Sequence, residues 1–171
     1  MLANLETASK ILSHPTWDLL VVFFFLAIGF FYGLMAGKKK LLAVLFSIYI
    51  SIILMGNFNY LEFFTEGEKI FTVFMIRAFA FLALILLLGI LFAKTIFRGK
   101  PKKEKWWQVF VLSFLEVGLL TSAVFQLLPA KDLFVFSPLV QTFFASGEVF
   151  FWWLTLPLVA LFFILRRKKE E

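Results

Sequence analysis

LLVVFFFLAIGFFYGLMA-GKKK-LLAVLFSIYISIILMGNF, residues 19–58, is the stretch that decides the fold of this chain. Two apolar runs, residues 19–36 and 41–58, are separated only by Gly37 and three lysines. A helix rises about 1.5 Å per residue, so each run is long enough to cross most of a hydrocarbon core of about 30 Å. Backbone polar groups in lipid must be paired within their own segment. The stretch therefore predicts two membrane-spanning helices joined by a tight antiparallel turn.

Three further apolar runs follow, over residues 70–93, 109–128 and 149–165. Each of them is also long enough to span a membrane as a helix. No linker between the runs is long enough to separate two domains. The sequence therefore predicts an all-α, polytopic membrane helical bundle with five transmembrane helices, built as a single integral membrane domain over residues 1–171.

Positive charge is concentrated in every second gap between these runs. Three Lys or Arg residues fill the first gap, six fill the third and four form the tail, so thirteen of the seventeen lie on one side. Short loops rich in Lys and Arg face the cytoplasm. We therefore expect the N-terminus outside and the C-terminus in the cytoplasm, as an odd number of crossings also requires. The thirteen are Lys38, Lys39, Lys40, Lys94, Arg98, Lys100, Lys102, Lys103, Lys105, Arg166, Arg167, Lys168 and Lys169.

Composition limits the chemistry that the chain can perform. Hydrophobic residues make up 62% of it, so the basic charge fits anchors facing lipid headgroups, and we expect the lipid bilayer as a partner and no nucleic acid. The chain has no cysteine and one histidine, His14, which predicts no disulfide, no metal centre and no cofactor. It also carries none of the sequence motifs of common hydrolases, metalloproteases or nucleotide-binding enzymes. A protein without enzymatic activity is expected.

Gly29, Gly33 and Gly37 recur at every fourth position along one edge of the first run. Glycines at this spacing form a flat groove that lets another helix backbone approach closely in a membrane. The groove fits packing within the chain, a face for self-association, or a helix that lines a pore. The spacing is a packing signal and is not specific for any activity.

Arg77 and Glu116 are charged residues inside the third and fourth runs. Ionisable side chains are costly in hydrocarbon and usually face a partner or water, so an intramembrane ion pair is the default hypothesis. The alternatives are an Arg77 side chain that reaches outward to the interface beside a protonated Glu116, and a role in moving ions or protons. Ser113 lies near the Glu116 face of the fourth run, and a second polar face carries Gly118, Ser122 and Gln126.

Two segments outside the five apolar runs also carry helical patterns. Residues 2–12 carry apolar side chains at helical spacing and suggest a short amphipathic helix on the outer surface. Residues 133–148 fit either a short interfacial helix starting at Pro138 or one long tilted helix from Pro138 to Leu165. Ser146, Gly147 and Glu148 read as a break and favour the separate piece.

Asp18-Leu-Leu, followed by GFFYGLMAGKKKLLAVL at residues 29–45, resembles the opening of the colicin V production protein family. The resemblance extends over about residues 17–128 through the order of a third span, a basic loop and a polar fourth span. Residues 106–116 depart from the family pattern because they lack glycine and carry Glu116, and the fifth span lies outside it.

The resemblance implies a bacterial cytoplasmic (inner) membrane protein linked to toxin production or export and to envelope maintenance, with no established enzymatic chemistry. We expect it to act through helix association, in a homo-oligomer or with other membrane proteins. The alternative is a small channel or transporter that uses Arg77 and Glu116.

Overall fold

The computed structural model describes residues 17–57, 67, 69–96, 106–133 and 135–166 of the chain. Its described residues are helical and include no strand. Five helices are long and apolar enough to cross a membrane, which confirms the five predicted spans. They are α2 (Trp17–Ala36), α3 (Lys38–Gly56), α5 (Ile70–Thr95), α6 (Trp106–Leu127) and α9 (Gly147–Arg166). The helix predicted over residues 2–12 lies outside the described residues.

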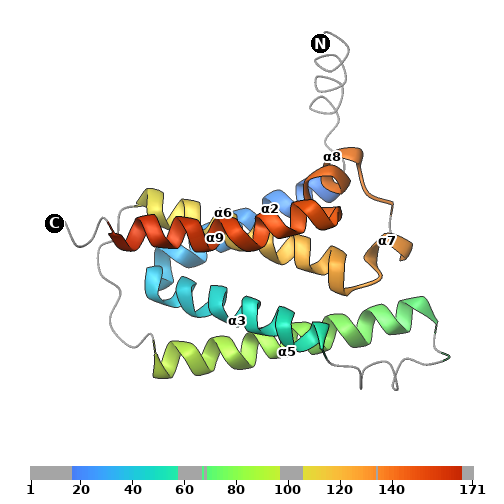
Figure 1. Cartoon of the computed structure of the whole chain (residues 1–171), viewed down its shortest axis with the longest axis horizontal. Coiled ribbons are helices and arrows are strands. Elements are labelled where there is room, and N and C mark those ends of the chain that lie inside the picture. The colour runs from blue at the N-terminus through green and yellow to red at the C-terminus, as the bar shows by residue number, and fades with distance from the viewer. Residues whose placement is uncertain (1–16, 58–66, 68, 97–105, 134, 167–171) are drawn as a thin grey trace, which may run out of the picture.

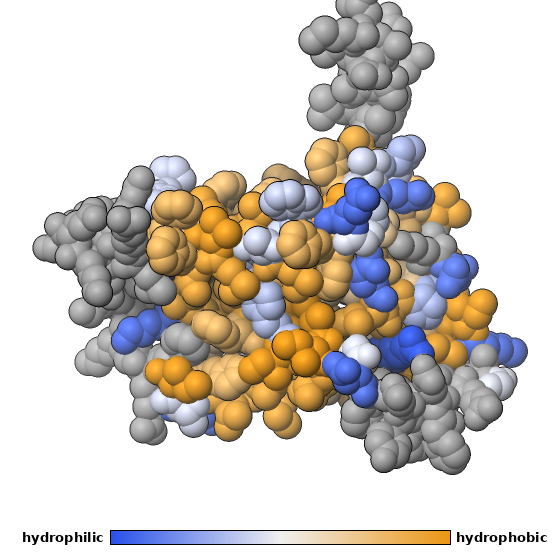
Figure 2. Space-filling model, viewed as in Figure 1, coloured by the Kyte–Doolittle hydropathy of each residue, from blue (hydrophilic) through white to orange (hydrophobic). Residues whose placement is uncertain are grey.

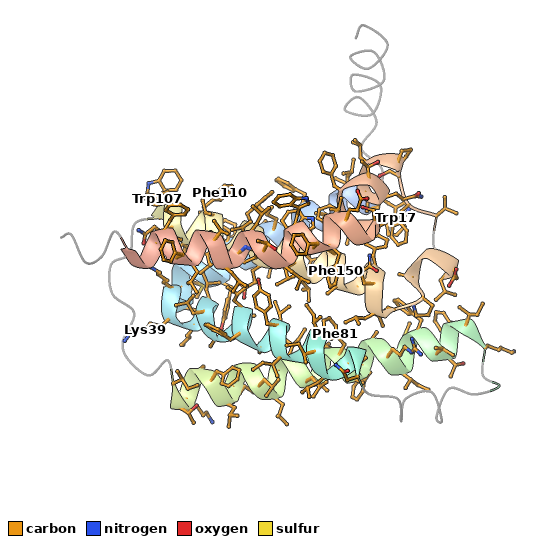
Figure 3. All side chains as sticks on the ribbon, viewed as in Figure 1. Trp17, Lys39, Phe81, Trp107, Phe110 and Phe150 are labelled. Carbon is orange, nitrogen blue, oxygen red and sulfur yellow. The ribbon has the colours of Figure 1, made fainter. Side chains whose placement is uncertain are left out.

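Successive long helices run in opposite directions (Figure 1). The ends of α2, α5 and α9 and the starts of α3 and α6 therefore lie together, at the left of Figure 1. Figure 3 shows Lys39 and Trp107 at this end and Trp17 at the other. We call the end with Lys38 to Lys40 the basic end, and the other the opposite end. Among the described residues, Lys38, Lys39, Lys40 and Lys94 therefore lie at one end of the bundle.

Helix α6 is the centre of the bundle, and α5 is its edge. Helix α6 packs against α2, α9 and α3, whereas α5 packs chiefly against α3 (Figure 1). Most of α6 is buried inside the bundle, whereas only a small part of α5 is. Apolar side chains cover most of the surface seen in Figure 2, as expected for helices in contact with lipid.

Gly37 forms the whole connection between α2 and α3. Its φ angle of 78° lies in the left-handed region, which glycine adopts without strain. Its N–H donates to the Gly33 carbonyl at 2.8 Å, and its carbonyl accepts from the Lys40 and Leu41 N–H groups. These bonds close one helix and open the next, as the predicted tight turn requires.

Residues 138–145 form a helical piece separate from the last span. Ser137 caps its start, with its Oγ accepting from the Val140 N–H at 3.4 Å. The piece consists of α8 (Pro138–Val140) and a π-helical turn, η1 (Gln141–Ala145). Ser146 is extended (φ −85°, ψ 149°), and α9 begins at Gly147. The predicted break is present, and one continuous helix from Pro138 is not. A short helix, α7 (Ala130–Leu133), precedes this piece.

Candidate functional site

Glu116 lies on the buried side of the central helix. It shares a face of α6 with Leu112, Leu119 and Ala123, which are fully buried, and Glu116 itself is 6% exposed. Its Oε1 atom is buried and has no hydrogen-bond partner. The Tyr32 hydroxyl on α2 interacts electrostatically with its carboxyl group. The structure thus holds a carboxyl inside a membrane-spanning core with one oxygen unsatisfied.

Arg77 also carries a buried polar atom without a partner, its Nε. The positions of the two residues along the long axis of the bundle show why Glu116 does not pair with Arg77. A Cβ atom added to Gly33 would lie 2.7 Å from Val109 Cγ1 and 2.8 Å from Leu41 Cδ1. Val109 on α6 and Leu41 on α3 therefore lie at one level of the bundle.

From that level, Glu116 on α6 and Ser47 on α3 both lie about 10 Å further toward the opposite end. Gly89 on α5 lies beside Ser47, since a Cβ added to it would be 3.6 Å from the Ser47 Oγ. Arg77 comes twelve residues before Gly89, which places it about 18 Å further still along the bundle. The expected ion pair between Arg77 and Glu116 is not formed, because the packing of α5 on α3 sets the two at different depths.

The glycine edge of α2 packs against α6 within the chain. Ser113 donates its hydroxyl to the Gly29 carbonyl at 3.1 Å, which requires close approach of the two backbones. A Cβ added to Gly29 would lie 3.1 Å from Val117 Cγ2, and Gly33 is equally tight. The structure therefore places Gly29 and Gly33 in an intrachain contact, while Gly37 serves the turn.

The second polar face of α6 receives the end of the 138–145 piece. Helices leave their last carbonyl groups unpaired, and here three side chains bond them. Ser122 donates to the Phe144 carbonyl at 3.0 Å, and Gln126 donates to the Ala145 carbonyl at 3.4 Å. From α9, the Trp153 indole donates to the Phe143 carbonyl at 2.7 Å.

Gly118 lies on the same face of α6 and leaves room there for the Trp153 ring. A Cβ added to Gly118 would overlap that ring, so only glycine fits at this point. The Trp153 ring also stacks on Phe144, with ring centroids 5.3 Å apart. Sequence analysis recognised Gly118, Ser122 and Gln126 as a polar face, but their partners are backbone carbonyls and an aromatic ring that leave no pattern in the sequence.

The start of the 138–145 piece is held by Asp18, a residue that is 3% exposed. Its Oδ2 accepts a hydrogen bond from the Ser137 N–H at 2.6 Å, and its Oδ1 accepts from the Leu19 N–H at 3.0 Å. Asp18 stands in the first turn of α2, so this bond ties the start of the first span to the segment before the last one. The two ends of the 138–145 piece are thus fixed by side chains from three different helices.

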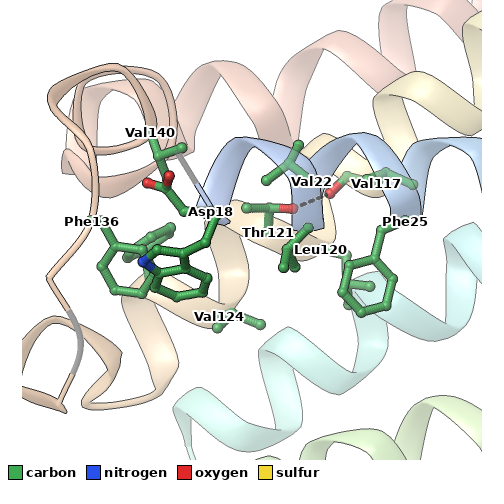
Figure 4. A pocket seen from close by; sticks show the side chains of 12 residues that line it. Asp18, Val22, Phe25, Val117, Leu120, Thr121, Val124, Phe136 and Val140 are labelled. Atoms are coloured by element: carbon green, nitrogen blue, oxygen red, sulfur yellow. Dashed lines mark hydrogen bonds between the residues drawn. The ribbon is translucent and has the colours of Figure 1, made fainter. Parts of the chain in front are cut away.

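A cavity of about 200 Å³ lies next to this contact, between α2 and α6 (Figure 4). The polar groups on its wall are already bonded: Thr121 donates to the Val117 carbonyl at 2.8 Å, and Asp18 binds two backbone amides. An apolar cavity of about 150 Å³ in a soluble protein binds benzene, so this wall suits hydrocarbon. It is lined by Trp17, Asp18, Val21, Val22, Phe25, Val117, Leu120, Thr121, Val124, Phe125, Phe136 and Val140.

Five apolar helices, with α6 at the centre, define a helical, multi-pass membrane protein. No protein-family model, curated protein or solved structure matches the chain. Within the described residues, no group of three or more His, Cys, Asp or Glu side chains could hold a metal ion. The arrangement offers three chemical features: a buried carboxyl, a cation on the edge helix, and an apolar cavity.

Proposed function

We propose that this protein is a non-enzymatic accessory of envelope maintenance or toxin export in the bacterial cytoplasmic membrane. It would act by packing against other membrane-spanning helices, with its basic end in the cytoplasm. The resemblance of residues 18–45 to the colicin V production protein family supports the membrane and the process. The charge pattern of the sequence, with the described Lys38, Lys39, Lys40 and Lys94 at one end of the bundle, supports the orientation.

The observation that carries the proposal is the apolar outward face of the edge helix. Helix α5 packs chiefly against α3, and the face of α5 that carries the buried Phe81 and Ile85 is turned toward the bundle. Arg77, four residues before Phe81, lies on this buried face, and its Nε is buried without a hydrogen-bond partner. The opposite face of α5 is therefore the one that another membrane-spanning helix can reach.

The outward face of α5 provides an apolar surface for another membrane-spanning helix. Its exposed residues recur at helical spacing along about four turns and form a continuous stripe: Met75, Phe79, Leu82, Leu86 and Ile90. Membrane helices associate through van der Waals packing along such a face. The proposed partner is a second copy of the chain or a different membrane protein.

Photo-crosslinking in cells tests this proposal. A photoreactive phenylalanine analogue replaces Phe79, which is 76% exposed on α5, or as a matched control Phe23, which is 69% exposed on α2. We expect a discrete protein adduct from position 79, absent from position 23. Equal protein adducts from both positions, or none from position 79, would contradict helix association through α5.

A channel or transporter is the second candidate, and it now depends on Glu116 alone. The unpartnered Oε1 in the centre of the bundle favours it, whereas the separation from Arg77 removes the ion pair on which it was based. Flux measurements on liposomes that contain the purified protein separate the two candidates. Ion or proton flux that Glu116→Gln abolishes would favour the transporter.

A further inference from the structure

Glu116 has no role in the proposed association through α5, yet it occupies the middle of the central helix. We infer that Glu116 is a proton-binding site, which takes up and releases one proton within the bundle. The inference rests on the burial of its carboxyl group, on its unsatisfied oxygen and on the groups that surround it.

Burial and hydrogen bonding favour the neutral carboxyl. A carboxylate has two oxygens that need donors, and Oε1 of Glu116 has none. A buried charge without a partner is far more costly than a neutral group in the same place. Leu112 and Leu119, one turn away on the same face of α6, are fully buried, and the nearby Ser113 hydroxyl already donates to the Gly29 carbonyl, so the packed bundle accommodates the protonated side chain better.

A proton is also the ligand that needs the fewest further groups around Glu116. Glu116 is in the wall of neither the cavity between α2 and α6 nor a second one between α6 and α9. No metal-binding group of three or more acidic, His or Cys side chains exists among the described residues. An organic or metal cation would need both space and further ligands, whereas a proton needs only the carboxyl oxygen.

The other titratable groups on the helices around α6 are distant or bonded. Tyr49 on α3 donates its hydroxyl to the Leu154 carbonyl. Asp18 on α2, Asp132 on α7 and Glu148 on α9 stand at the opposite end, and Lys38, Lys39 and Lys40 on α3 stand at the basic end. Proton binding in the core is therefore assigned to Glu116 alone.

The sign of the pH effect follows from this assignment. The folded bundle favours the protonated carboxyl, while the unfolded chain releases that proton at neutral pH. The folded state therefore binds more protons, and its stability falls as pH rises. One proton changes the unfolding equilibrium by at most about tenfold per pH unit.

Infrared spectroscopy of the full chain in liposomes tests the inference between about pH 5 and about pH 9. We expect the carbonyl band of a buried protonated carboxyl at low pH and its conversion to additional carboxylate absorption as pH rises, and we expect Glu116→Gln to lose this conversion. If the carbonyl band is absent at every pH, Glu116 does not bind a proton. If the band is present and does not change with pH, Glu116 does not release its proton in this range. Either result would overturn the inference.

Two further measurements keep the test decisive if the glutamine variant does not fold. Dicyclohexylcarbodiimide reacts with protonated carboxyl groups in apolar surroundings, so it should modify Glu116 of the unmodified chain less as pH rises. Unfolding in detergent should become easier with rising pH in that chain. Modification of the described end residues Asp132 or Glu148, with Glu116 spared, would contradict the assignment.

Discussion

The carboxylate of Asp18 accepts a hydrogen bond from the backbone N–H of Ser137, 119 positions later in the chain, at 2.6 Å. This contact joins the first turn of α2 to the start of the 138–145 piece. Because both groups are buried, the bond is protected from competition with water. It sets where the chain re-enters the bundle before its last span.

Replacing Asp18 should therefore loosen a segment far away in the sequence. Asp18→Ala leaves the Ser137 N–H buried without an acceptor, at a cost of about 1–3 kcal/mol. We expect faster hydrogen exchange at residues 137–145 in detergent micelles, with α3 unaffected. Asp132→Ala, at an exposed acid on α7, is the control. Unchanged exchange in the Asp18 variant would show that the bond does not hold the segment.

Ser122 and Thr121 are neighbours on α6 whose hydroxyl groups have different partners. Ser122 donates to the Phe144 carbonyl of η1, whereas Thr121 donates to the Val117 carbonyl of its own helix. Ser122→Ala should cost about 1–2 kcal/mol, because it leaves a helix-end carbonyl unpaired. Thr121→Ala should cost less. Thermal unfolding of both variants in one detergent gives the comparison, and equal losses would argue against docking of η1 on α6.

Gly33 and Gly89 provide a matched test of the glycine edge. A methyl group at Gly33 would press against Val109 and Leu41 at less than 3 Å, while at Gly89 its nearest neighbour is 3.6 Å away. Gly33→Ala should lose about 1–3 kcal/mol through overpacking. Gly89→Ala should be neutral, or stabilising by up to about 1 kcal/mol through helix propensity. Melting temperatures in the reverse order would rule out the close packing of α2 on α6.

A double-mutant cycle tests the separation of Arg77 and Glu116. Residues that share no contact show additive effects within about 0.5 kcal/mol. We expect additivity for Arg77→Leu and Glu116→Leu in unfolding measurements. Recovery of stability in the double variant would instead reveal a direct pair and would contradict the depths described above.

Sequence reasoning located the features that local chemistry determines. The five spans follow from hydropathy, the turn at Gly37 from one glycine between two runs, and the break at Ser146 from three residues that disfavour a continuous helix. Each signal lies within a few residues of the structure that it predicts. No contact elsewhere in the chain is needed to recognise it.

Relations between helices were harder to predict. Arg77 and Glu116 were expected to meet because both are polar residues in apolar spans. Their depths in the membrane, however, depend on the register in which α5 packs along α3. That register is set where Gly89 packs on Ser47 and by the apolar core between the two helices. The contact between Asp18 and Ser137 was missed for a similar reason, since one partner is a backbone amide.

The central claim is a bundle of five crossings with its basic end in the cytoplasm. The chain has no cysteine, so single cysteines can be introduced into an otherwise unreactive background. Whole cells are treated with a maleimide that cannot cross the membrane. Gly67→Cys and Lys131→Cys should react in intact cells, and Lys40→Cys and Lys103→Cys only after permeabilisation. Reaction at Lys103→Cys in intact cells, or protection at Lys131→Cys, would contradict the claim.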